Sequence, residues 1–278
     1  MRVKNKGVGT IMDILWYVVV FILIQLVVEM IGAFVWGHYH GETMQQTITS
    51  MANGQLGLLM AGTSVASSLI TILLFTLCRW APVSRSWLRS RPWGVLFWVV
   101  LLTIGTILPA EWLYEQLQLQ MPEQAEALFE GIMKEPWGYL AIGIFVPVAE
   151  ELVFRGAILR VLLNLFSKQM HWVAIVFSAL IFGAVHMNLA QGVHAFMIGL
   201  LLGWMYYRTR SVIPGIALHW VNNSVAYVMF NLMPEMSDGK FIDLFHGDSR
   251  LMYMGLGCSV CVFLPSLFQL FIRMKRAE

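Results

Sequence analysis

Long apolar segments constrain this chain more than any other feature of its sequence. The first of them, residues 13–36, has Asp13 and Glu29 as its only charged side chains. A helix needs about 20 mostly apolar residues to cross the hydrocarbon core of a bilayer. Eight segments meet this description: about 13–36, 56–78, 93–110, 137–163, 171–189, 192–207, 211–233 and 251–272. We therefore predict an all-α, polytopic membrane protein with about eight transmembrane helices.

The overall composition agrees with lipid as the main solvent. Hydrophobic residues make up 58% of the 278 residues and charged residues only 12%, whereas soluble proteins carry about 25% charged residues. The mean hydropathy is +0.70. A net charge of +2 gives no indication of nucleic-acid binding. The partners that we expect are the lipid bilayer and a peptide or membrane-protein substrate.

The distribution of Lys and Arg predicts the orientation of the chain. With eight spans and the N-terminus in the cytoplasm, 14 of the 18 basic residues fall on the cytoplasmic side and three on the other, with Arg155 inside the membrane. Cytoplasmic loops of membrane proteins carry such an excess of Lys and Arg. We therefore expect both termini in the cytoplasm and a location in the plasma membrane.

The chain is interpreted as one integral membrane domain, 1–278, because it contains no internal repeat, linker or low-complexity segment. Residues 111–136 form an acidic connector in which Leu128, Phe129, Ile132 and Met133 recur at helical spacing. This pattern fits an amphipathic helix on the outer membrane surface, and an ordinary solvated connector remains the alternative. The segment 234–250 is expected to be an irregular loop.

Ionisable residues inside the fourth predicted span are the first candidates for function. Each costs roughly 2.5–3.5 kcal/mol at the centre of a membrane helix, so such residues usually pair, line a cavity or act. Glu151 and Arg155 are four residues apart and share a helix face, so they can form an ion pair. Glu150 points elsewhere and has no such partner. A carboxylate in apolar surroundings suits a general base.

Two further spans carry polar groups at comparable depth. His186 lies in the fifth, with Phe182 one turn before it, and His219, Asn222 and Asn223 lie in the seventh. At about 1.5 Å per residue, Glu150 and His186 lie roughly 20 Å from the cytoplasmic ends of their helices, Asn223 near 18 Å and His219 near 12 Å. A single cavity could gather these side chains. The alternative for any one of them is a hydrogen bond that holds two helices together.

These residue types fit peptide-bond hydrolysis. A glutamate beside an imidazole can orient and deprotonate a water molecule, and imidazole and carboxamide groups can stabilise the oxyanion that forms on the attacked carbonyl. The other polar membrane residues are assigned lesser roles. His194 is interpreted as a packing or gating residue, Asn188 and Asn222 as supporting groups, and Glu29 as a residue that reaches the interface.

Three motifs in this region resemble those of a known family. Residues 150–155 (EELVFR) fit EExxxR, 182–186 (FGAVH) fit FxxxH, and 219–223 (HWVNN) fit HxxxN. In order and spacing they resemble the CPBP family of intramembrane proteases, also called the Abi or CAAX-protease family. Its members include eukaryotic CAAX prenyl endopeptidases and bacterial proteins linked to bacteriocin maturation or self-immunity. The resemblance covers about residues 137–235, the expected catalytic core.

The resemblance implies roles for the matched residues. Glu150 would activate the water together with His186, Glu151 and Arg155 would support it, and His219 with Asn223 would form the oxyanion site. It also implies a cavity open to the cytosol or the lipid. No cofactor is expected to be required.

A zinc ion on His186, His219 and Glu150 is the alternative, because two histidines and a glutamate are a known zinc set. Leader-peptide processing, CAAX-type processing and self-immunity all remain open as roles. So do a non-catalytic immunity or scaffold protein and a proton-coupled transporter.

Overall fold

The computed structural model describes residues 6–83, 86–233 and 240–275, and within them every regular element is a helix. The predicted all-α class is therefore confirmed.

The larger elements are α1 (Lys6–His40), α2 (Met44–Ala52), α3 (Gly57–Leu77), α5 (Trp93–Gln116), α6 (Glu123–Met133), α9 (His171–Ala184), α10 (Leu189–Thr209), α11 (Ile213–Leu232) and α12 (Ser249–Arg273). Between α6 and α9 the chain forms four successive helical segments: η1 (Leu140–Phe145), α7 (Val146–Glu151), η2 (Leu152–Leu159) and α8 (Arg160–Leu165). The short elements are α4 (Ser86–Arg89), η3 (Lys168–Met170) and η5 (Phe241–Phe245).

Five of the described helices are long and apolar enough to cross a membrane, namely α1, α3, α5, α10 and α12. The other three predicted spans correspond to the η1–α8 segments, to α9 and to α11. In α9 only 14 residues are helical, and α11 contains His219 and three asparagines, which lower its hydropathy. The predicted count of eight spans therefore remains a prediction.

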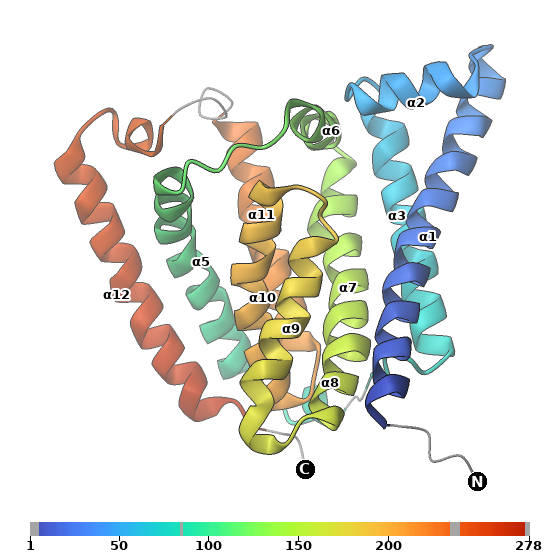
Figure 1. Cartoon of the computed structure of the whole chain (residues 1–278). Coiled ribbons are helices and arrows are strands. Elements are labelled where there is room, and N and C mark those ends of the chain that lie inside the picture. Colours follow the sequence, from blue (N-terminus) through green and yellow to red (C-terminus); the bar gives the residue numbers. More distant parts are fainter. Residues whose placement is uncertain (1–5, 84–85, 234–239, 276–278) are drawn as a thin grey trace, which may run out of the picture.

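The helices form a bundle with α1 and α12 on opposite flanks and α7, α9 and α10 between them (Figure 1). Large apolar side chains on both flanks face outward: Phe34 in α1 is 63% exposed and Phe268 in α12 is 62% exposed. Apolar surface of this extent is unfavourable in water. It is expected where lipid surrounds the bundle, so the arrangement fits an integral membrane protein.

The start of α1 and the end of α12 lie at the same end of the bundle (Figure 1). Arginines that the sequence assigns to the cytoplasm make contacts there. Nη2 of Arg208 donates to the carbonyls of Phe271 (2.6 Å) and Met274 (3.1 Å), and Nη2 of Arg160 donates to Trp80 O (2.8 Å). The start of α1 and the end of α12 thus belong to one side of the bundle, and the compartment on that side remains a prediction.

The fourth predicted span is an unusual helix, because η1 and η2 are π-helical segments of six and eight residues. Glu150 and Glu151 end the short α-helical stretch between them. In η1 the Val146 N–H donates to Ala141 O, five residues back, and Pro147 has no N–H to donate. Ile142 O is thereby left without the backbone donors of a regular helix. Wide turns of this kind are often found at functional sites.

Small residues allow neighbouring helices to approach closely. A Cβ atom added at Gly105 of α5 would lie 2.7 Å from the backbone nitrogen of Phe263 in α12. One added at Gly183 of α9 would lie 2.6 Å from Gly192 O in α10. Close backbone contact through glycine is the usual way in which helices pack inside membranes.

The amphipathic helix predicted in the acidic connector is present as α6. Its apolar side is covered by protein, because Leu128 and Ile132 pack against the buried residues Met51 and Met60. Phe129 and Met133 line a cavity described below. The placement of α6 on the membrane surface stays a prediction.

Candidate active site

The ion pair predicted within the fourth span is present and fully buried. Nη1 of Arg155 lies 2.7 Å from Oε1 of Glu151, and the two side chains are 1% and 0% exposed. Nη2 of Arg155 donates to Gly199 O at 3.4 Å. Because so few other polar groups reach these atoms, Oε2 of Glu151 and Nε of Arg155 have no hydrogen-bond partner among the described residues.

His219 lies between the two glutamates. Its Nε2 is 3.7 Å from Oε2 of Glu150, and its Nδ1 is 3.5 Å from Oε1 of Glu151. The Glu150 side chain is 14% exposed, whereas Glu151 is completely buried. The two adjacent carboxylates therefore differ as the sequence suggested, since one is paired with arginine and the other reaches a partly open space beside an imidazole.

This placement differs from the depth estimate, which put His219 nearer the cytosol than Glu150. The estimate assumed the rise of a straight α-helix in every span. The π-helical segments η1 and η2 flank the glutamates, and their wider turns shift residues relative to that count. His219 consequently lies 3.7 Å from Glu150 instead of nearer the cytosolic side.

Phe182 connects the two histidines. Its ring centroid lies 5.1 Å from that of His186 and 5.9 Å from that of His219, edge to face in both cases. Cζ of Arg155 lies 4.4 Å from the same centroid, which is a cation–π contact. Phe182 thus separates the imidazoles by one ring and covers the guanidinium.

His186 lies just beyond α9, which ends at Ala184 instead of continuing to residue 189. Its Nδ1 is 2.8 Å from Phe182 O. Only a protonated nitrogen can donate to that carbonyl, so Nε2 of the neutral ring is the free acceptor. Asn188 begins α10 as its N-cap and donates to His186 O at 3.0 Å. The predicted supporting role of Asn188 therefore corresponds to a contact with the backbone of His186.

The amides of α11 form a chain of hydrogen bonds. Nδ2 of Asn222 donates to Oδ1 of Asn223 (3.2 Å), and Nδ2 of Asn223 donates to Ile142 O (2.9 Å). This is the carbonyl that Pro147 leaves without a backbone donor. The irregular geometry of η1 and the orientation of Asn223 are thereby linked.

Two residues beside the site were not among the predicted site residues, although the sequence analysis had assigned His194 a packing or gating role. Gly215, one turn before His219, leaves space for the ion pair, because a Cβ atom there would lie 2.5 Å from Oε2 of Glu151. His194 of α10 reaches the amides of α11, because its Nε2 is 3.5 Å from Nδ2 of Asn222. The pattern gave a weak signal for each: a glycine four residues before a motif histidine, and a third histidine in a membrane helix.

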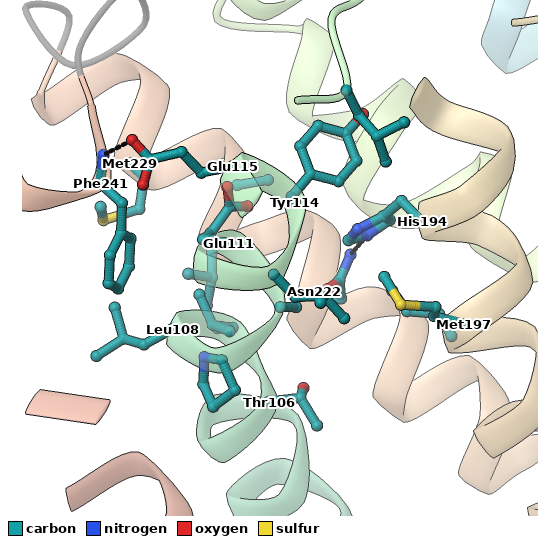
Figure 2. Close-up of a pocket in the computed structure, with 18 of the residues that line it drawn as sticks. Thr106, Leu108, Glu111, Tyr114, Glu115, His194, Met197, Asn222, Met229 and Phe241 are labelled. Carbon is teal, nitrogen blue, oxygen red and sulfur yellow. Dashed lines mark hydrogen bonds between the residues drawn. The ribbon is translucent and has the colours of Figure 1, made fainter. Parts of the chain in front are cut away.

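A cavity of about 1490 Å³, which we name the distal cavity, lies beside this group. It is lined by residues of α5, α10, α11 and α12 and extends to α6 and η5, at the end of the bundle opposite the start of α1 and the end of α12. Figure 2 shows His194 and Asn222 on its wall, opposite Tyr114 and Glu111 of α5. The resemblance implied a cavity open to the cytosol or the lipid, whereas this one reaches the loops at the opposite end from the predicted cytosolic side.

The alternative of a zinc ion on His186, His219 and Glu150 remains a prediction. In the part of the chain that the structure describes, no three His, Cys, Asp or Glu side chains form a group that could hold a metal ion. Arg155 places a positive charge against Glu151, which makes a further cation at that carboxylate less favourable.

The helical bundle places His219 3.7 Å from Glu150 and 3.5 Å from Glu151. These residues lie inside a match to a known protein family. Residues 132–225 match the family model described as type II CAAX prenyl endopeptidase Rce1-like, and this domain belongs to the CPBP (Abi) family. The match contains all three motifs and supports an intramembrane endopeptidase function. A search of curated proteins and a search of solved structures each gave no match.

Proposed function

We propose that this protein is an intramembrane endopeptidase in which Glu150 activates a water molecule. The observation that carries the proposal is the separation of 3.7 Å between Glu150 Oε2 and His219 Nε2. This distance is too long for a direct hydrogen bond and suits two groups that bind the same water molecule. The partly open position of Glu150 beside a buried, arginine-paired Glu151 fits this role.

In the proposed reaction Glu150 takes a proton from the bound water while the oxygen attacks the carbonyl carbon of the scissile peptide bond. Nδ2 of Asn223 has a second hydrogen besides the one given to Ile142 O. It donates this hydrogen to the oxyanion of the tetrahedral intermediate. The proton held by Glu150 then passes to the leaving nitrogen as the C–N bond breaks, which gives a carboxylic acid and an amine.

The remaining residues support this centre. Glu151, held by Arg155, faces Nδ1 of His219 and keeps the imidazole directed toward Glu150. His186 presents Nε2 as an acceptor, since Nδ1 is engaged by Phe182 O, and it assists proton transfer from the water. No metal is required in this scheme, in which the carboxylate is the activating group.

The substrate is a peptide or a membrane-associated protein. Leader-peptide or bacteriocin processing, CAAX-type processing and a role in self-immunity all suit such an enzyme. The proposed location is the plasma membrane, with both termini in the cytoplasm.

The test uses the purified full chain in detergent with a panel of quenched fluorescent peptides, in water enriched in ¹⁸O. We expect cleavage with one ¹⁸O atom in each new carboxylate, and the same rate after treatment with a zinc chelator. Loss of activity on chelation, restored by zinc, would contradict the metal-free mechanism. If no peptide is cleaved and the protein carries out proton-coupled transport in proteoliposomes, the protein is a transporter and the peptidase assignment is wrong. A cellular immunity phenotype that survives Glu150→Gln would indicate a non-catalytic protein.

A further inference from the structure

His194 occupies a position where the distal cavity meets the hydrogen-bonded amides of α11. It lies in the second turn of α10, and its side chain reaches the cavity wall together with Asn222 (Figure 2). On α11, Leu218 and Asn222 face the cavity, and the residues directly after them are His219 and Asn223. The wall that contains His194 is therefore linked to the proposed catalytic groups through Asn222, whose amide donates to Oδ1 of Asn223.

The hydrogen bonds of the Asn222 amide show that His194 acts as an acceptor. An amide nitrogen can only donate, so Nε2 of His194 must accept from Nδ2 of Asn222, at 3.5 Å. The other hydrogen of the same Nδ2 goes to Oδ1 of Asn223. Both hydrogens of Asn222 are thus used, and the Asn223 carboxamide is held at its oxygen by Asn222 and at its nitrogen by Ile142 O.

We propose that His194 is a positioning residue of this centre: it fixes Asn222, and through Asn222 it directs the free N–H of Asn223 toward the carbonyl of a peptide bound at the wall of the distal cavity. The inference rests on the proposed endopeptidase function. Without the acceptor on His194, the Asn222 amide can turn, and Asn223 loses its fixed orientation. A donor that must reorient during the reaction stabilises the transition state less, while the binding of the substrate is little changed.

The experiment compares kcat and KM for variants of the full-length protein in detergent. His194→Phe keeps the ring and removes the acceptor, whereas His194→Gln puts an amide oxygen near the position of Nε2. Leu189→Met is the control on the same helix, since Leu189 is 72% exposed and does not line the distal cavity. We expect His194→Phe to lower kcat at least tenfold with KM within about twofold, His194→Gln to recover most of the loss, and Leu189→Met to retain the wild-type kcat.

A double-mutant cycle that combines His194→Phe with Asn222→Leu tests the coupling between these two residues. It compares kcat of the two single variants with kcat of the double variant. If His194 acts through Asn222, the double variant is no slower than the slower single variant. An unchanged kcat in His194→Phe, a His194→Gln variant as slow as His194→Phe, or losses that multiply in the double variant would each overturn the inference. Activity that persists in Glu150→Gln would instead refute the proposed function, so the two failures are distinguishable.

Discussion

Nε2 of His219 lies 3.7 Å from Oε2 of Glu150 and approaches it from a different helix. The opposite nitrogen of the same ring faces Glu151, whose charge is already balanced by Arg155. One imidazole therefore connects a buried ion pair to a carboxylate that is partly open. The two adjacent glutamates therefore have different surroundings, as the proposed mechanism requires.

The Glu151–Arg155 pair is expected to dominate the stability of the centre. Arg155→Gln leaves a fully buried carboxylate without its partner, which should lower the free energy of unfolding by about 3–5 kcal/mol. Thermal unfolding in detergent, followed by tryptophan fluorescence, measures the change. The double variant Glu151→Gln/Arg155→Gln removes both charges and should recover a large part of the loss. A double variant as unstable as the single one would contradict the pairing argument.

Gly215 should tolerate no side chain. Its added methyl group would meet Oε2 of Glu151 at 2.5 Å, and that carboxylate cannot move without leaving Arg155. We expect Gly215→Ala to reduce peptidase activity at least tenfold. Gly62→Ala in α3 is the matched control, because nothing lies within 4 Å of the new methyl group. Alanine there should raise stability by about 0.5–1 kcal/mol and leave activity unchanged. Equal activities of the two variants would refute the role of Gly215.

Phe182 is predicted to be needed for both stability and catalysis. Phe182→Leu removes the contact with Arg155, worth about 2 kcal/mol for a desolvated cation–π pair, and the ring that separates His186 from His219. Phe177→Leu on the same helix replaces a side chain that is 50% exposed and should change neither property. The melting temperature and the kcat of Phe182→Leu should therefore both be clearly lower than those of Phe177→Leu. Identical values for the two variants would argue against this role of Phe182.

Asn223 should be replaceable only by a residue that keeps a donor. Asn223→Asp has nearly the same shape but cannot donate, so kcat is expected to fall by about 10²–10³, as for other oxyanion-site donors. Asn231→Asp is the control in α11: Asn231 donates to Met133 O, so its loss should affect stability and not kcat. Near-normal turnover by Asn223→Asp would exclude the oxyanion role.

Much of the architecture follows from the sequence because its causes are local. The apolar segments predicted four of the long helices, α3, α10, α11 and α12, with both ends within three residues, for example 56–78 against Gly57–Leu77 in α3 and 211–233 against Ile213–Leu232 in α11. The Glu151–Arg155 pair was predictable because both residues belong to one helix, where a spacing of four residues fixes the contact.

Contacts between helices were harder to predict. The partner of Glu150 depends on helix tilt and on the π-helical turns around Pro147, which shift the register by amounts that hydropathy does not encode. The early end of α9 places His186 in a turn instead of a helix. His194 was interpreted as a packing or gating residue near the start of its helix, and only the approach of α10 to α11 brings it to Asn222.

The central claim is that Glu150 is the base that activates the attacking water. Its most direct test is the kcat of Glu150→Gln, measured on a cleaved peptide in detergent, with Glu29→Gln in α1 as the same change at an exposed site outside the cluster. We predict that Glu150→Gln keeps its thermal stability and loses at least a thousandfold in kcat, while Glu29→Gln retains the wild-type rate. A folded Glu150→Gln variant with turnover close to that of the wild type would contradict the mechanism.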